Sequence, residues 1–222
     1  MVKFICRAFG LAILIPVLSI SSAAQAGVCT AQDGASVEVR LIDPAPRVVT
    51  SSSLKQINSK AKAHGLLKRG NLVLGLTQSE VETSMNIRYR GFNQGGRICL
   101  NVYRVEARFG HSRLNIQMPR EYARGSCQYK TVLKHEMEHV RVNREGVRKY
   151  ASTLKRELEK ALARFNPRQV ANMKTGQAQA QRILKKVVKS VTTRFHKEID
   201  AQHALIDKPG GPYDASGACR SW

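Results

Sequence analysis

Hydrophobic and polar residues alternate along much of the first half of the chain, which is the pattern of strands that bury one face. The alternation is clear over residues 36–42 and stops at 43–46, where Asp and Pro favour a turn. Later stretches read as successive strands: 71–76, 83–90, 97–106 and 112–118. Turns are expected at 93–96 and 109–111, and a short helix over 53–63. The pattern predicts a curved antiparallel sheet, connected by hairpins, with one face packed on helices.

The second half of the chain changes to the period of a helix. Ser126 suits an N-cap, and one apolar stripe follows it. Its members are Leu133, Met137, Val140, Val147, Ala151, Leu154, Leu158 and Leu162. Phe165-Asn-Pro167 ends this helix, and a second helix begins near 168 or 169. Its expected buried stripe is Leu184, Val188, Val191, Phe195, Ile199 and Ile206. We therefore expect an α+β fold with two long C-terminal helices packed on the sheet.

The first 26 residues have the features of a secretory signal peptide. A basic start, an apolar run from Ala8 to Ile20 and an Ala-Gln-Ala ending at Ala26 support this assignment. We expect export to the periplasm or the medium, with no transmembrane segment in the mature chain. Residues 27–222 then form one domain, mostly β over 27–125, a helical pair over 126–207 and a loop over 208–222.

Export changes the interpretation of the cysteines, because oxidising compartments favour disulfides. Removal of the signal leaves Cys29, Cys99, Cys127 and Cys219, an even number that permits three pairings. One arrangement would join Cys29 to Cys219, tying the chain ends together, and Cys127 to Cys99, anchoring the helix start to a strand. The sequence leaves this pairing open.

The net charge of +21 indicates that anionic partners are favoured. An anionic envelope surface is one possible partner. A highly soluble cationic surface with no dedicated site explains the charge equally well. The basic residues are spread along the chain, and no nucleic-acid motif with aromatic stacking positions occurs, so specific nucleic-acid binding is not expected.

The first helix contains His135-Glu-Met-Glu-His139. Helical residues four apart lie about 40° from each other around the axis, so both imidazoles point the same way and can hold one metal. In H-E-x-x-H sites the glutamate, here Glu136, is the general base for a water that the metal activates. Gly146 falls at about the same angle and should leave this face open beyond the histidines. The motif predicts a zinc (Zn2+) site for amide hydrolysis; the alternative is an amphipathic helix with histidines on a solvated face.

A catalytic zinc usually takes three protein ligands. The second helix should run back beside the first and supply the third ligand, in the order of preference Asp200, His203 and then Glu198, with His196 also a candidate. Glu145 has metzincin-like spacing, but Val142 stands where those enzymes have a helix-breaking glycine. A surface cluster without a metal role is the remaining alternative.

Several elements resemble the bacterial secreted zincin-like peptidases of the DUF922 type. They are the signal peptide, the strand-rich first half, residues 118–120 before the helix, the motif at 135–139, and Ile199-Asp200 late in the second helix. The likeness covers roughly the C-terminal half. The family's second element has Thr and His-Gly after its aspartate, which this chain lacks. The resemblance implies a zincin-like fold and a zinc-dependent peptidase that acts outside the cytoplasm.

The sequence thus favours an exported peptidase in which His135, His139 and Asp200 or His203 bind zinc and Glu136 is the general base. Its partner would be a peptide or protein substrate. A non-catalytic cationic protein that binds the cell envelope is the first alternative. A zinc amidase acting on cell-wall peptides is the second.

Overall fold

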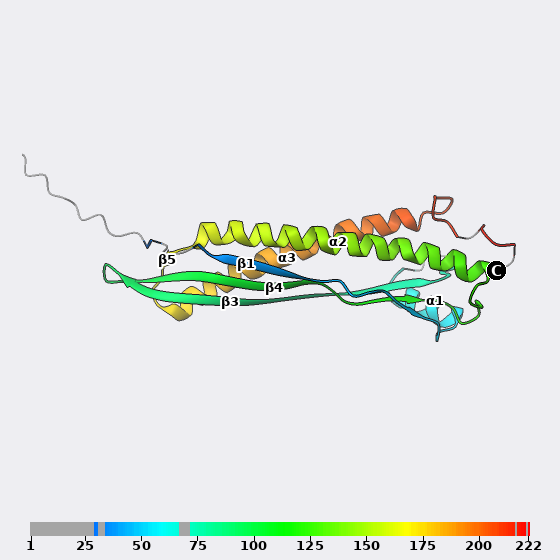
Figure 1. The fold of residues 1–222 in the computed structure, drawn as a ribbon, viewed down its shortest axis with the longest axis horizontal. Coiled ribbons are helices and arrows are strands. Elements are labelled where there is room, and N and C mark those ends of the chain that lie inside the picture. Colours follow the sequence, from blue (N-terminus) through cyan, green and yellow to red (C-terminus); the bar gives the residue numbers. More distant parts are fainter. Residues whose placement is uncertain (1–28, 31–33, 67–71, 216, 221) are drawn as a thin grey trace, which may run out of the picture.

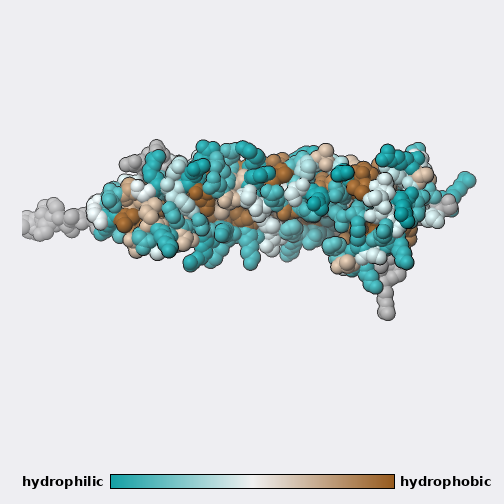
Figure 2. Space-filling view, turned by 90° about the horizontal axis from the view of Figure 1, so that it is seen from below, coloured by the Kyte–Doolittle hydropathy of each residue, from teal (hydrophilic) through white to brown (hydrophobic). Residues whose placement is uncertain are grey.

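The computed structural model describes residues 29–30, 34–66, 72–215, 217–220 and 222. The predicted signal peptide lies outside these residues. The described chain is elongated, with two long helices running along an equally long β-ribbon (Figure 1). The α+β class expected from the sequence is confirmed. Hydrophilic side chains cover much of the surface drawn in Figure 2, with smaller hydrophobic areas between them.

The ribbon is a hairpin of β3 (Leu76–Gln94) and β4 (Arg97–Gln117). Gly95 and Gly96 form its turn with φ values of +58° and +74°, which glycine adopts without steric cost. The turn expected at 109–111 is wrong, because β4 continues through Gly110. A Cβ on Gly110 would overlap the carbonyl oxygen of Ile42, so this glycine serves a close approach of two strands instead.

The sheet is mixed rather than wholly antiparallel. β1 (Ser36–Ile42) and β2 (Arg47–Val49) pair in parallel with β4, whereas β3 and β5 (Arg168–Gln169) pair with it in antiparallel fashion. β1 and β2 follow one another in the same direction along one edge of β4. The chain then passes through α1 (Leu54–Ala63) and returns as β3 on the other edge. The prediction of an antiparallel, hairpin-connected sheet therefore holds only for part of it.

Two bulges keep one face of β4 buried along its whole length. The pairing register with β3 leaves out Tyr103 and Ser112 of β4. After each of these extra residues, the buried face changes between even-numbered and odd-numbered positions of β4. The buried positions change accordingly, from Leu100 and Val102, to Val105, Ala107 and Phe109, to Leu114 and Ile116. The same side of the sheet thus faces the helices from end to end.

Helix α2 (Cys127–Phe165) begins and ends where the sequence predicts. The Ser126 side chain accepts a hydrogen bond from the Tyr129 amide, and Asn166 caps the other end before Pro167. α3 (Met173–Ile206) starts later than expected, because residues 168–169 form β5 against β4. Among the described residues, no helix is both long and apolar enough to cross a membrane.

The predicted apolar stripe of α2 is confirmed from Val140 onward but wrong at the start of the helix. Met137 is 42% exposed and Leu133 is only partly buried. The buried positions there are Val132, Glu136, His139 and Asn143. A different face of α2 is buried here, because this end of the helix packs against the start of β3 and the end of α3. Polar side chains of α2 therefore lie inside the structure.

The disulfides join Cys29 to Cys99 and Cys127 to Cys219. All four predicted cysteines are used, but the pairing considered from the sequence is wrong. Cys99 lies near the hairpin end of β4, while α2 begins beyond the other end, about 60 Å of strand away. The two bonds therefore fasten opposite ends of the molecule, and they are compatible with an extracellular location.

Asp43, directly after β1, links the sheet to α2. Its carboxylate accepts hydrogen bonds from Arg144 (2.7 and 3.1 Å) and Arg148 (2.8 and 3.2 Å), and only 10% of its side chain is exposed. Hydrogen bonds from Arg144 outweigh the effect of burial and lower the pKa of Asp43 below 3.8. The charged form of Asp43 is therefore the form that stabilises the fold.

Replacing Asp43 with Asn should lower the free energy of unfolding by about 1–3 kcal/mol at neutral pH, because charge-assisted hydrogen bonds are lost. A carboxyl with a lowered folded pKa contributes stability above its unfolded value of 3.8 and loses it as the pH falls through the folded value. The difference from the unchanged protein should therefore shrink below about pH 4. Urea unfolding at several pH values measures this.

The matched control is Glu38→Gln, which removes a carboxylate that is 55% exposed and paired with Arg40 and Arg104. It should change the free energy of unfolding by less than about 0.5 kcal/mol. Equal losses in both variants would mean that Asp43 has no special structural role.

Candidate metal centre

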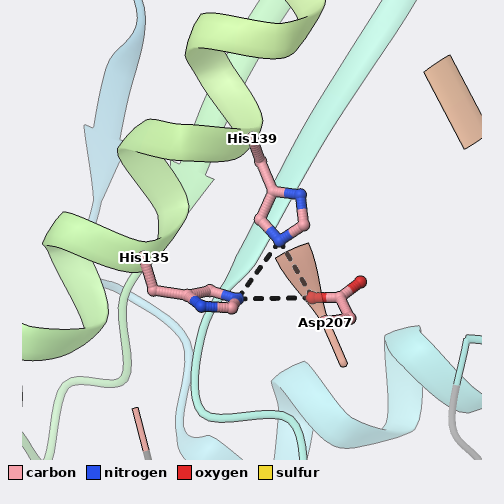
Figure 3. A group of neighbouring side chains, drawn as sticks. All are labelled: His135, His139 and Asp207. Atoms are coloured by element: carbon pink, nitrogen blue, oxygen red, sulfur yellow. Dashed lines mark hydrogen bonds and ion pairs between the residues drawn. The ribbon is translucent and has the colours of Figure 1, made fainter. Parts of the chain in front are cut away.

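His135 and His139 meet the carboxylate of Asp207, the residue that follows α3. Figure 3 shows both rings turned toward this carboxylate. The Nε2 atoms lie 3.2 Å apart, and Oδ1 of Asp207 lies 3.3 Å from Nε2 of His135 and 3.0 Å from Nε2 of His139. Among the described residues, these three form the group of His, Cys, Asp or Glu side chains close enough to share an ion.

The spacing of these three atoms fits a tetrahedral zinc ion. Ligand atoms bonded to zinc at about 2.0–2.2 Å lie about 3.3 Å from one another at the tetrahedral angle. The three measured distances, 3.0, 3.2 and 3.3 Å, agree with this within a few tenths of an ångström. Two imidazoles and one carboxylate are also a donor set that zinc accepts in catalytic sites, with a fourth position left for water or substrate.

The register of the two helices explains why Asp207, and not Asp200, reaches the histidines. Ile199 of α3 packs beside Gly146 of α2, where a Cβ would overlap its Cδ1 atom. The helices run antiparallel, so the partner of His139, seven residues before Gly146, must lie about seven residues after Ile199. Asp207 meets this requirement. Asp200 is level with Gly146 and is exposed.

The second nitrogen of each histidine is also held. Nδ1 of His135 lies 2.8 Å from the carbonyl oxygen of Tyr213, in the C-terminal segment. Nδ1 of His139 lies 2.8 Å from Nδ1 of His203. When Nε2 binds a metal, Nδ1 carries the proton and donates to such a partner, which fixes the orientation of the ring. His203, predicted as an alternative ligand, thus contacts His139 instead of joining the three-atom group.

The electrostatics of the site favour a positive charge between the imidazoles and the carboxylate. Burial would lower the pKa of His135, but hydrogen bonds to Asp207 and Tyr213 and the charge of Glu136 raise it to about 9. Burial would raise the pKa of Asp207, but hydrogen bonds from both histidines hold it well below its usual range. Burial and the neighbouring His139 lower the pKa of His203 to about 4, so that it is neutral at pH 7.

Glu136 points from α2 toward the start of β3 and is 3% exposed. Its Oε2 accepts a hydrogen bond of 2.7 Å from the Thr77 hydroxyl, and Gly75 leaves the space that the carboxylate occupies. Burial raises the pKa of Glu136, against the opposing effects of His139 and Thr77. A carboxylate with a raised pKa is suited to accept a proton near neutral pH.

Asn143 connects the site to the sheet and is 2% exposed. Its amide nitrogen donates to the carbonyl oxygen of His139 at 2.9 Å and lies 3.2 Å from Nε2 of His203. Its amide oxygen accepts a hydrogen bond from Ser79 of β3. The sequence alone gives Asn143 no role, because its partner Ser79 lies 64 residues away in the chain.

The other predicted candidates lie outside the group. Glu145 forms an ion pair with Arg141 on the exposed side of α2, and Glu198 forms one with Lys149. His196 is exposed on α3. The face near Gly146 that should be open is instead closed by Phe195 and Ile199.

The purified chain should bind about one zinc ion, because three donor atoms already lie at tetrahedral spacing. His135→Ala and Asp207→Ala should each weaken zinc affinity more than about tenfold, while Asp200→Asn leaves it unchanged. Competition titration with a chromophoric chelator measures the affinities. Loss of zinc in Asp200→Asn but not in Asp207→Ala would contradict the assignment.

The disulfide near the site should also affect zinc affinity. Cys127–Cys219 fastens the C-terminal segment whose Tyr213 carbonyl holds His135. Replacing both cysteines with Ala should weaken zinc binding by about tenfold, which is typical for loss of a group that orients a ligand. The matched control replaces Cys29 and Cys99, at the opposite end of the sheet, and should leave the affinity unchanged. Equal effects would indicate a general loss of stability.

Comparisons with known proteins do not identify this chain. No family model, no curated protein and no solved structure matches it. The likeness to DUF922-type peptidases and the zincin-like fold that it implies therefore stay predictions.

Proposed function

We propose that this chain is a zinc-dependent peptidase that acts in the periplasm or outside the cell. The observation that carries the proposal is the meeting of His135, His139 and Asp207 at tetrahedral spacing, beside the buried carboxylate of Glu136. A purely cationic binding protein would need neither the three converging donors nor a buried acid next to them. Burying a carboxylate costs free energy, so its place beside the site favours a chemical role.

Each residue of the site has a distinct task in this proposal. Zinc held by His135, His139 and Asp207 would lower the pKa of a water molecule and polarise the substrate carbonyl. Glu136 takes a proton from the attacking water and later delivers it to the leaving amine. Thr77 keeps the Glu136 side chain in place by its hydrogen bond. Tyr213 and His203 orient the two imidazoles.

The edge of β3 beside the site suits an extended peptide. Within the described residues β3 pairs with β4 alone, so its other edge carries no strand. Thr77 and Ser79 place the first residues of this edge next to Glu136 and Asn143. A substrate that adds to the edge as a further strand would be bound mainly through its backbone, which tolerates varied sequences.

Glu136→Gln should reduce peptide hydrolysis by at least about a hundredfold while the chain keeps its zinc, because only the proton acceptor is lost. The control is Glu138→Gln, which removes a carboxylate that pairs with Arg141 and should leave the rate within about twofold. Cleavage of a mixed peptide library, followed by mass spectrometry, provides the rates. Cell-wall peptides are assayed in parallel to identify the substrate class.

Hydrolysis that is unchanged in Glu136→Gln would contradict the role of Glu136. A zinc-loaded chain that cleaves neither proteins nor cell-wall peptides would contradict the proposed function itself, and the metal centre would then be structural.

A further inference from the structure

A cavity lies between α3 and the middle of β3, on the part of α3 that precedes the metal centre. Its volume is about 410 Å³, and its walls are one face of α3 and three consecutive residues of β3, 83–85. Lys185, Lys189 and His196 line it from the helix. Helical residues at this spacing share one face, and the three span about 16 Å along the axis.

The charged side chains that line this cavity are of one sign. Its lining includes the two lysines and no acidic side chain. Residues 173–197 of α3 contain seven Lys or Arg and no Asp or Glu. The nearest acid in β3, Glu82, alternates to the opposite face of the sheet and pairs there with Arg108. A ligand in the cavity therefore experiences a positive potential, which favours an anion.

A buried hydroxyl in the cavity wall lacks a partner. The Oγ1 atom of Thr192 is buried and forms no hydrogen bond with any described residue. Helical threonines usually satisfy this group through the carbonyl four residues earlier, as Thr153 does with Lys149. An unsatisfied buried donor is costly, and a small rotation of the Thr192 side chain toward the cavity would let a ligand oxygen satisfy it.

Apolar side chains also line the cavity. Met85 and Val188 line it and pack against the hydrophobic core behind it. The ligand should therefore carry an apolar group beside its charge. Lysine ammonium groups act as point charges that suit phosphate oxygens, and the surrounding hydroxyls can donate to the same oxygens.

We propose that this cavity binds a phosphate ester, with its phosphate held by Lys185, Lys189 and Thr192 and its apolar group against Met85 and Val188. Two sources share this chemistry, a soluble phosphorylated metabolite and the headgroup of an anionic phospholipid. The inference is independent of peptide hydrolysis, since none of these residues belongs to the metal centre.

The test is a titration of the zinc-free chain with n-hexyl phosphate, followed by two-dimensional NMR of the backbone amides. Removing zinc prevents the phosphate from binding through the metal. We expect saturable one-to-one binding that shifts the amides of residues 83–85 and 185–196. Lys185→Gln with Lys189→Gln should weaken binding at least tenfold.

The matched control is Lys186→Gln with Lys197→Gln, which removes the same charge from α3 outside the cavity lining and should change the affinity less than twofold. Equal weakening in both pairs, or the absence of saturable binding, would overturn the proposal.

Cosedimentation with phosphatidylglycerol vesicles distinguishes the two sources. Binding that is lost only in the Lys185 and Lys189 pair identifies a lipid headgroup. Vesicle binding unaffected by that pair, together with saturable hexyl phosphate binding, identifies a soluble ester.

Discussion

The close packing of α3 against α2 at Gly146 is the contact on which the candidate site depends. Gly146 lacks the side chain that would collide with Ile199 and Phe195, so the two helices can approach each other there. Phe195 also packs edge-on against Phe109 of β4 and Tyr150 of α2, which fixes α3 on both the sheet and the other helix. The register set by these contacts carries the end of α3 to the histidines and places Asp207 beside them.

The parts of the fold that follow local rules could be predicted from the sequence. Ser126 and Asn166-Pro167 mark the two ends of α2, and Ser53 marks the start of α1, because caps and prolines act within a few residues of themselves. The role of Gly110 could not be predicted in this way, because it depends on a strand that is distant in the sequence. A glycine in a turn and a glycine under a neighbouring strand look the same in sequence, and only the position of Ile42 separates them.

The candidate site also combines a local part, which the sequence predicts, with a part that depends on contacts between distant segments. His135, Glu136 and His139 lie within one helix, so their spacing alone brings the two imidazoles together. The third donor depends on the alignment of two helices, which the sequence does not give, and for this reason the sequence favours Asp200. Gly146 in a long helix indicates close helix packing, but the sequence does not show which residue of α3 lies opposite it. Only the contact of Gly146 with Ile199 in the structure fixes the count that leads past Asp200 to Asp207.

The proposed function requires that His135, His139 and Asp207 coordinate a metal. The most direct measurement is the crystal structure of the zinc-loaded chain, with the metal located by anomalous scattering at the zinc edge. We expect one peak at about 2.0–2.2 Å from Nε2 of His135, Nε2 of His139 and a carboxylate oxygen of Asp207. A peak bonded to other residues, or no peak between the two histidines, would show that these residues do not form the metal centre.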